Sequence, residues 1–504
     1  MSSFVQRCGI DSDQRRQALA QAAALIRRSG VELVRFAWCD QHGVLRGKTL
    51  VASAAERAMQ DGVGMVGTLL LKDSSDRTCF GVFGADGPDH LQAFRGAANL
   101  VLLADPSTYR QLPWATNTGW VLCQPWYQNA SPVPLDTRHV LQQALLRLKE
   151  RGLGMCCGLE VEFHIYRMTD HGAGGGAELD PEQAAWPGLP PRLSMVHPGY
   201  QLLGEACADM ADAPLRIVQR TAQGLGLPLL SLEVELGPSQ VEAVFDVSDA
   251  LRAADNMVLF RNGVGQALRR AGYHASFMCR PPFPNVMSSG WHLHHSLVDA
   301  ASGRNALMCE QAPGAAQEQA AAGVLSRTGQ HYLAGLLAHA RGMAPFCIPS
   351  INGYARLQAH AMAPQSAVWA RDNRGAMLRV IANPAVDGEN FLPDTATRIE
   401  NRLGEPSANP YLYMAAQIHA GLDGLQRQLP LPAASTQPYD VNDARLPASL
   451  DEALTALQGD PALVAAFGAD FIDYLVTIKR AELTRHAQAS DKMDWERREY
   501  FSRP

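Results

Sequence analysis

The sequence predicts an α+β protein with a small N-terminal domain and a large C-terminal domain. Residues 14–29 carry apolar positions at helical spacing, and Gly30 supplies a stop. The segment VELVRFAWCD then alternates as a strand, and QHG turns it into VLRGKTL. A loop-rich stretch with two prolines leads to QPWYQNASPVP, so we expect domains at residues 1–130 and 131–504.

The second domain mixes helices with strands. It opens with the helix HVLQQALLRLKERG, which runs into the strand GLEVEF. Further helices are expected at 214–225, at 247–271 and in the tail from DEALTALQGDPALVAAFG onward, with strands at 229–236, 241–245, 274–279 and 291–298. Residues 167–192 are rich in Gly, Pro and polar side chains, which predicts an exposed, mobile insertion.

Composition narrows the classes of partner. The 504 residues include 50 acidic and 44 basic side chains without a long run of either sign, so no nucleic-acid groove or polybasic membrane surface is expected. No long apolar segment indicates secretion or membrane spanning, which makes the cytoplasm the expected compartment. The ten cysteines form no CxxC pair and suit reduced thiols. The expected partners are therefore small molecules.

Two carboxylates in GLEVEF point the same way from an apolar strand. Because successive side chains of a strand alternate between faces, Glu160 and Glu162 share one face, while Leu159, Val161 and Phe163 take the other. The segment LEVELGPSQVEAVF adds acidic residues on either side of a Gly-Pro turn, WHLHHSL adds two histidines at strand spacing, and TRIENR adds a glutamate between arginines. The side chains meant are Glu235, Glu242, His292, His294 and Glu400.

Carboxylates with imidazole suit a hard divalent ion such as Mg²⁺ or Mn²⁺ better than structural Zn²⁺. Taken singly, each of these elements is more often a solvated strand edge, a core histidine pair or a plain turn. Arginines in WARDNRGAMLRV and INGYARL, namely Arg371, Arg374, Arg379 and Arg356, suit carboxylate and phosphate oxygens. Metal-binding carboxylates beside such arginines indicate phosphoryl transfer, although a surface ion pair remains the commoner role of any single arginine.

The order of the motifs resembles the glutamine synthetase superfamily. The resemblance runs from about residue 18 to the terminus and rests on DQHGVLRGKT, LPWATNTGWVLC, GLEVEF, the acidic hairpin with Gln240, FMCRPPF, SGWHLHHSL, NGYARL, DNRGAMLRV, TRIENR and SANPYLYMAAQIHAGLDGL. It implies a β-grasp-like N-terminal domain, a larger α/β catalytic domain with a curved antiparallel sheet, and a dodecamer of two hexameric rings. It also implies an ATP-dependent ligase in which the γ-carboxylate of glutamate becomes an acyl phosphate that an amine displaces.

The resemblance also implies roles for single residues. The first metal would be held by Glu162, Glu235 and Glu242, and the second by Glu160, His292 and Glu400. The nucleotide would contact His294, Ser296, Phe245, Arg379 and Arg398, and the transferred phosphate would be stabilised by Arg374, Arg379 and Arg398. The substrate side would comprise Arg356 and Arg402 on the α-carboxylate, together with Glu162, Tyr200 and the ammonium-site residue Asp73, which would act on a neighbouring subunit.

Two departures from the family pattern concern the substrates. Met287 and Ser288 stand where the family has an Asn-Gly pair that contacts the amino acid. Met362 stands where the family has a flap glutamate that binds ammonium and takes its proton, which methionine cannot do. The alternative is that Met362 only packs in the lid and the amine binds elsewhere.

These departures favour an amine larger than ammonium. An aromatic amine such as aniline is already neutral and prefers an apolar, polarizable wall, so we expect a γ-glutamylamide synthetase that takes a hydrophobic amine. The alternatives are a polyamine or alkylamine ligase, glutamine synthetase using ammonium, and a non-catalytic relative. The non-catalytic alternative fits poorly with six filled metal positions.

Overall fold

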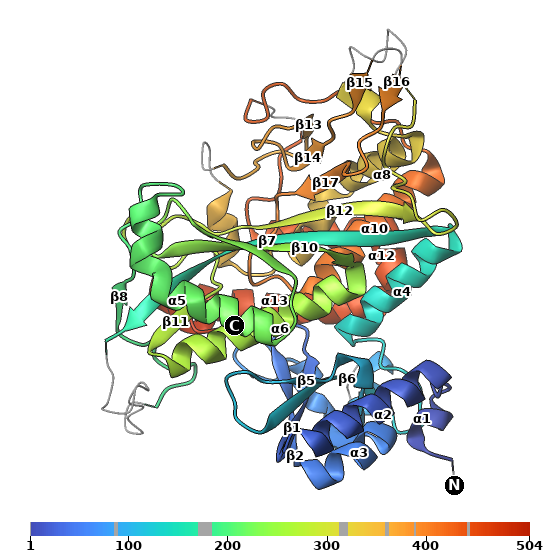
Figure 1. The fold of residues 1–504 in the computed structure, drawn as a ribbon, viewed down its shortest axis with the longest axis vertical. Helices are drawn as coiled ribbons and strands as arrows, with labels where there is room; N and C mark the ends of the chain where they lie inside the picture. The colour runs from blue at the N-terminus through green and yellow to red at the C-terminus, as the bar shows by residue number, and fades with distance from the viewer. Residues whose placement is uncertain are drawn as a thin grey trace.

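The computed structural model describes residues 2–84, 89–169, 184–311, 321–357, 362–387, 390–440 and 444–503. Two large sheets organise the chain, one formed by residues 33–126 and the other by residues 153–401. Figure 1 shows the first sheet in blue at one end of the molecule and the second across its middle. The predicted α+β class with a curved, mainly antiparallel catalytic sheet is confirmed.

The N-terminal sheet has six strands in the order β2-β1-β6-β4-β3, with β5 paired to β6. The strands are β1 (Leu33–Cys39), β2 (Leu45–Val51), β3 (Val63–Val66), β4 (Asn99–Ala104), β5 (Arg110–Gln111) and β6 (Thr118–Trp126). Its helices are α1 (Phe4–Arg7), α2 (Asp13–Arg28) and α3 (Ala52–Asp61). The β1–β6 pair is parallel and the other pairs are antiparallel.

The second sheet has nine strands in the order β13-β14-β17-β12-β7-β10-β9, with β8 and β11 also paired to β7. The strands are β7 (Leu153–Met168), β8 (Leu193–Met195), β9 (Leu229–Val234), β10 (Gln240–Asp249), β11 (Tyr273–Ser276), β12 (Trp291–Asp299), β13 (Trp369–Arg371), β14 (Leu378–Ile381) and β17 (Arg398–Asn401). A small hairpin, β15 (Ala385–Asp387) with β16 (Asn390–Leu392), stands apart. The central strand is therefore the one that carries GLEVEF.

One face of this sheet is covered by helices. These are α4 (Thr137–Glu150) and α6 (Ala250–Arg270), which pack on β7, and α5 (Glu205–Gly224), which packs on β9. The odd-numbered side chains of β7 face them: Phe163 is fully buried, with its ring centroid 5.9 Å from that of Phe260 of α6. Burying each such ring stabilises the fold by about 1.5–3 kcal/mol. The even-numbered carboxylates consequently face the opposite side of the sheet.

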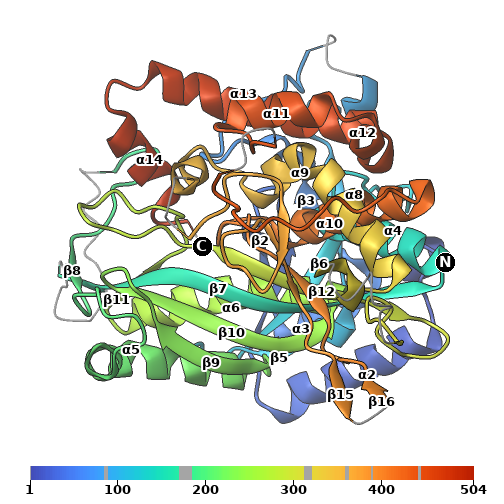
Figure 2. The same ribbon diagram turned by 90° about the horizontal axis from the view of Figure 1, so that it is seen from above.

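The remaining helices lie after β12 in the sequence, with α8 and α9 before β13 and the others after β17. They are α8 (Arg327–Ala338), α9 (Ala340–Cys347), α10 (Pro410–Arg427), α11 (Leu450–Gln458), α12 (Pro461–Phe467), α13 (Ala469–Gln488) and α14 (Lys492–Tyr500). Short 3-10 segments lie at Gly67–Leu71, Asp89–Ala97, Pro106–Thr108, Ala321–Val324 and Asn352–Arg356. In Figure 2 the red helices α11–α13 run along one side of the molecule. The predicted helical tail is thus confirmed.

The structure corrects one predicted helix and leaves two predictions open. α5 begins at Glu205 rather than at 214, because Pro214 lies inside the helix instead of at its start. The division at residue 130 falls between β6 and α4 and stays a prediction. Of the predicted insertion at 167–192, residues 170–183 lie outside the described residues.

Two observations bear on the compartment. Among the described residues, no single helix has the length and apolar composition needed to cross a bilayer, and only the pair α12 and α13, bent by 102°, meets both requirements together. All ten cysteines are free thiols.

Candidate active site

Strand register gathers the predicted acidic residues and histidines on the open face of the nine-stranded sheet. Glu242 of β10 lies opposite Glu162 of β7, and His292 of β12 lies opposite Glu160. Farther across the sheet, His294 of β12 lies opposite Glu400 of β17. Directly opposite residues share a face, so four neighbouring strands present one continuous row of polar side chains. We call it the acidic row; its members are Glu160, Glu162, Glu242, His292, His294 and Glu400.

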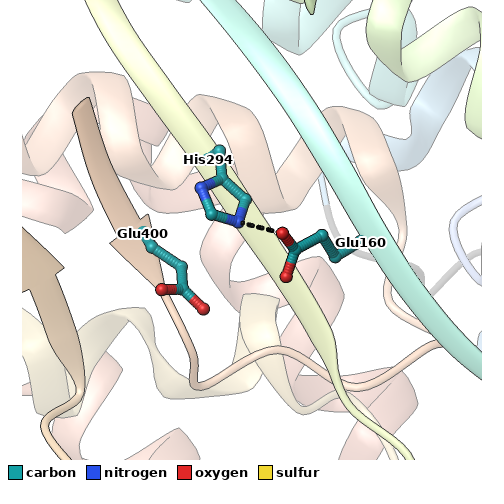
Figure 3. Close-up of side chains that lie close together, drawn as sticks. All are labelled: Glu160, His294 and Glu400. Carbon is teal, nitrogen blue, oxygen red and sulfur yellow. Dashed lines mark ion pairs between the residues drawn. The ribbon is translucent and has the colours of Figure 1, made fainter. Parts of the chain in front are cut away.

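Glu160 stands at the centre of this row. Its Oε1 lies 3.0 Å from His294 Nε2, and its Oε2 lies 3.4 Å from His292 Nδ1. Figure 3 shows Glu160 and Glu400 on either side of His294. Two sets of three ligand atoms, each set within 4.8 Å, share Glu160: one is completed by Glu242 and His292, the other by His294 and Glu400.

Several carboxylates of this row are buried close to one another. Burial, followed by the charges of Glu162 and Glu160, raises the pKa of Glu242 to about 10. Burial raises the pKa of Glu162 to about 7 against the opposing effect of Arg356, and burial also raises that of Glu235. The site therefore carries more carboxylates than its own cations neutralise.

The histidines counter part of this charge. Although burial opposes it, hydrogen bonds from His292 and His294 hold the pKa of Glu160 well below its usual range. Burial and the neighbouring Arg402 lower the pKa of His292 to about 4, so its ring is neutral at pH 7. A neutral imidazole is the form that ligates metal.

The donor set fits divalent metal. Clustered carboxylate oxygens with neutral imidazole nitrogens suit a hard cation, and a cation removes the repulsion that raises the carboxylate pKa values. The clusters differ in membership from the predicted ones. His294 joins one of them, whereas Glu162 and Glu235 lie beside the clusters rather than in them.

Glu162 is fixed by neighbours around the β9–β10 turn. Its Oε2 accepts hydrogen bonds from the Gly290 amide at 2.9 Å and from the Gln240 side-chain amide at 3.1 Å. The turn reverses tightly because Ser239 adopts a left-handed φ of 60° and the Gln240 amide donates to the Gly237 carbonyl. Glu235, at the end of β9, is only partly buried and accepts the Leu236 amide at 3.3 Å.

Two arginines predicted to grip the α-carboxylate are already engaged within the protein. Arg356 Nη1 donates to the carbonyls of residues 402, 403 and 404 at 3.0–3.3 Å, and its Nη2 lies 3.5 Å from His292 Nε2. A Cβ on Gly290 would lie 2.4 Å from Arg356 Nη2, so a side chain there would displace the guanidinium. Arg402 pairs with Glu400 and donates to the Met362 carbonyl at 3.5 Å.

Of the three arginines predicted to stabilise the transferred phosphate, two contact side chains of the row and one is exposed. Arg379 of β14 binds Glu400 at 3.0 Å and also pairs with Asp372, while Arg398 Nε donates to His294 Nδ1 at 3.2 Å. Arg374 is exposed in the turn after β13 and forms no ion pair among the described residues. The structure thus brings Arg379 and Arg398 to the row, while the role of Arg374 stays a prediction.

A cavity of about 850 Å³ opens beside the row. It is lined by four of the five predicted nucleotide residues, Phe245, His294, Ser296 and Arg398, and by Glu160, but not by the fifth, Arg379. Its volume lies within the range of small-molecule and cofactor sites. One end of this cavity therefore reaches the acidic row at Glu160 and His294.

Asp73 lies elsewhere in the chain. Its Oδ1 accepts the amides of Ser75 and Arg77, both at 2.9 Å, and its Oδ2 accepts Arg485 Nε at 2.7 Å. The side chain is 1% exposed. The structure does not bring it to the acidic row of its own chain, and its expected contribution to a neighbouring subunit stays a prediction.

Tyr200 and Met362 are exposed near the row. The Tyr200 hydroxyl donates to the Asn285 carbonyl at 2.9 Å, and its amide donates to the Leu236 carbonyl next to Glu235. Met362 is 54% exposed, and its carbonyl contacts Arg402. Both have left-handed φ angles, 64° and 53°, which are costly for such side chains and concentrate at functional sites.

Two residues beside the site were not expected. Glu233 lies opposite Glu242 and adds to the charge that raises its pKa; its two-residue spacing from Glu235 in LEVEL was the available signal. Arg280 of the FMCRPPF motif donates from Nη1 to the Ser288 hydroxyl at 3.1 Å. The backbone of Arg280 is held by two hydrogen bonds with the buried side chain of Asn352. Asn352 is distant in the sequence, and no sequence pattern indicates this contact.

Comparison with known proteins accords with this geometry. A family model described as the glutamine synthetase catalytic domain matches residues 134–500. A γ-glutamylanilide synthase of an Acinetobacter species is 36% identical over 99% of this chain and 98% of its own length. A glutamate–isopropylamine ligase of a Pseudomonas species is 29% identical over 94% and 96%, respectively. The solved structure of GmaS in complex with ADP superposes with a TM-score of 0.72 at 26% identity, covering 95% of this chain and 98% of that chain.

Proposed function

Because the chain belongs to the glutamine synthetase family, we propose that it joins the γ-carboxylate of glutamate to a hydrophobic, aniline-like amine at the expense of ATP. ATP-dependent γ-glutamyl amide formation is the chemistry of its relatives and of this enzyme. The observation that carries the proposal is the acidic row, which joins a nucleotide-sized cavity at Glu160.

The reaction has two steps whose atoms balance. A γ-carboxylate oxygen of glutamate attacks the γ-phosphorus of ATP, and ADP leaves; the amine nitrogen then attacks the acyl carbon, phosphate leaves, and the nitrogen loses a proton. The first step brings a carboxylate to a polyphosphate, so like charges must be offset. Arg379 and Arg398, at the nucleotide end of the row, are the side chains placed to do so.

The acidic row would hold the metal. Glu160, Glu242 and His292 would form one set of ligands, and Glu160, His294 and Glu400 the other. When bound, a divalent cation offsets phosphate charge and aligns the nucleotide oxygens. The ligands are mainly oxygen donors, which supports Mg²⁺ or Mn²⁺ as the ion.

The amine side supports a hydrophobic substrate. Met362 offers no carboxylate to stabilise a cation or accept a proton, and it is exposed beside Arg402 with Tyr200 as a second exposed side chain near Glu235. Aniline is neutral at pH 7, so its nitrogen lone pair needs no base to become available. The relatives named for anilide and isopropylamine products support an amine larger than ammonium.

An amine panel tests the proposal. Purified protein with Mg²⁺, ATP and glutamate is supplied with aniline, isopropylamine, ethylamine, putrescine or ammonium, and products are read by phosphate release and mass spectrometry. We expect aniline to give the highest kcat/KM and a γ-glutamylanilide mass. Fastest turnover with putrescine or ethylamine would support the polyamine and alkylamine alternative, and fastest turnover with ammonium would support glutamine synthetase.

A Met362→Glu variant places a carboxylate at this position. We expect it to lower the ratio of kcat/KM for aniline to kcat/KM for ammonium.

The remaining proposals concern assembly and compartment. We propose a homododecamer of two hexameric rings in which Asp73 acts on a neighbouring subunit, and light scattering of the purified protein tests its mass. A cytoplasmic location is supported by the ten free thiols, which suit a reducing compartment.

A further inference from the structure

We propose that Arg280 is a further substrate-binding residue, which recognises the α-carboxylate of the acid substrate. This inference rests on the proposed function, because it takes glutamate as the acid. It starts from the finding that the two expected carboxylate-binding arginines, Arg356 and Arg402, already hold backbone carbonyls and Glu400, which leaves the buried Nε of Arg402 without a hydrogen-bond partner among the described residues. A third guanidinium beside the same site has donors to spare.

The backbone of Arg280 is fixed to the motif that carries Arg356. The Arg280 amide donates to Asn352 Oδ1 at 2.8 Å, and Asn352 Nδ2 donates to the Arg280 carbonyl at 3.1 Å. Asn352 is 5% exposed and begins the 3-10 segment that ends at Arg356. This two-point clamp holds the two arginine backbones in one rigid arrangement, as a binding residue requires.

The side chain of Arg280 lacks a counter-ion. Its guanidinium is partly buried, and its only side-chain hydrogen bond among the described residues is the one to Ser288 Oγ at 3.1 Å. It forms no ion pair with any described carboxylate, in contrast to Arg379, Arg402 and Arg485. A partly buried guanidinium with five donors and one neutral acceptor is suited to receive a carboxylate.

The contact with Ser288 places Arg280 at the substrate end of the acidic row. The Ser288 carbonyl accepts the Gln240 side-chain amide at 3.3 Å, and the same amide donates to Glu162. Two residues later, the Gly290 amide also donates to Glu162. Residues 288–290 therefore contact Arg280 on one side and Glu162 on the other.

The two carboxylates of glutamate would then occupy opposite ends of the site. The γ-carboxylate has to meet the nucleotide beside Glu160, so the α-carboxylate is directed away from the cavity. Met287 and Ser288 stand in place of an Asn-Gly pair, and the polar side chains beside them, Ser288, Ser289 and Gln240, are neutral. Arg280 supplies the missing charge.

Titration calorimetry of the holoenzyme with Mg²⁺ and ADP tests this role without requiring turnover. Glutamate is compared with 4-aminobutyrate, which lacks the α-carboxylate, on the native protein and on Arg280→Gln, Arg280→Lys and Arg216→Gln. Arg216 is an exposed arginine paired with Asp212 on α5 and serves as the matched control. For Arg280→Gln we expect glutamate affinity to fall about 30-fold or more, as for loss of a charge-assisted pair, with 4-aminobutyrate unchanged. The Arg280→Lys variant should recover part of the loss.

The possible outcomes bear on this inference and on the proposed function in different ways. Equal losses for both acids indicate a merely structural role for Arg280 and overturn the inference, as does unchanged glutamate affinity in Arg280→Gln. A native protein that binds neither acid overturns both. A native protein that binds glutamate through Arg280 but forms no amide with any amine supports the inference and rejects the proposed function.

Discussion

Two buried groups of charged side chains differ in how their charges balance. The acidic row on the nine-stranded sheet crowds Glu160, Glu162, Glu242 and Glu400 around neutral His292, and the pKa of Glu242 is raised to about 10. The second group, which we call the junction cluster, joins the loop after β3 to α13 and α14. Its members are Asp73, Lys479, Glu482, Arg485, Glu499 and Arg503.

In the junction cluster, every carboxylate meets a cation. Arg485 binds Asp73 at 2.7 Å and Glu499 at 2.9 Å, and Lys479 binds Glu482 at 3.2 Å. Although burial opposes it, the contact with Arg485 holds the pKa of Glu499 below its usual value. A balanced cluster stabilises the fold it lies in, whereas an unbalanced one lowers stability until a ligand brings the missing charge. The imbalance therefore distinguishes the functional site from the structural one.

The largest expected effect comes from removing a charge from the unbalanced group. Glu242→Gln should lower kcat/KM for amide formation by about 10³-fold or more, because a metal ligand is lost. The free energy of unfolding of the metal-free protein should stay equal or rise by about 1 kcal/mol, because glutamine is neutral without the proton that the buried Glu242 carboxyl, with its pKa of about 10, must take up at pH 7. Steady-state kinetics and urea unfolding measure the two. A variant that is both inactive and strongly destabilised would place Glu242 among the structural charges.

The opposite pattern is expected in the junction cluster. Glu499→Gln leaves Arg485 without its bidentate partner, so the free energy of unfolding should fall by about 3 kcal/mol. The control is Asp494→Asn, which breaks the exposed pair with Arg498 on the same helix and should cost under about 1 kcal/mol. Urea unfolding of both variants checks this, and equal losses would contradict it.

The smallest expected effect is a dependence of metal binding on pH. The folded pKa of Glu242, about 10, lies above its ordinary value of 4.5, so its stabilising contribution in the metal-free protein is complete below 4.5 and lost as pH rises through 10. Glu499 has a lowered pKa, and its contribution is instead lost as pH falls. Metal must displace the proton of its proposed ligand Glu242, so the apparent Kd for Mg²⁺ should weaken about tenfold from pH 7 to pH 6. Calorimetry at both pH values measures this, and a constant Kd would contradict it.

The main strands of the fold were predictable because their side chains alternate strictly. GLEVEF and WHLHHSL place apolar residues toward the helices and polar residues toward the open face, and the structure pairs these two strands directly. Helix α5 was predicted to begin nine residues too late, because a proline marks a helix start more often than a helix interior. Pairing order across the sheet is set by long-range contacts and was available only through the family resemblance.

The composition of the site was more predictable than its geometry. Spacing alone placed Glu160 with Glu162 and His292 with His294, but it could not show that Glu160 belongs to both ligand clusters. Nor could it show that Arg356 is engaged by three carbonyls, because those bonds depend on a turn 46 to 48 residues away. Asp73 illustrates the same limit, since its partner Arg485 lies 412 positions later.

The long central strand β7 carries a consequence for how this gene can change. Its sixteen residues pair with β8, β10, β11 and β12, so their register is shared by most of the sheet. Deleting one codon between Gly154 and Leu159 would turn Glu160 and Glu162 into the aromatic core and push Phe163 into the acidic row. Insertions and deletions that survive selection must therefore fall in the connections between strands. Functional homologues should keep the segment that corresponds to β7 at constant length.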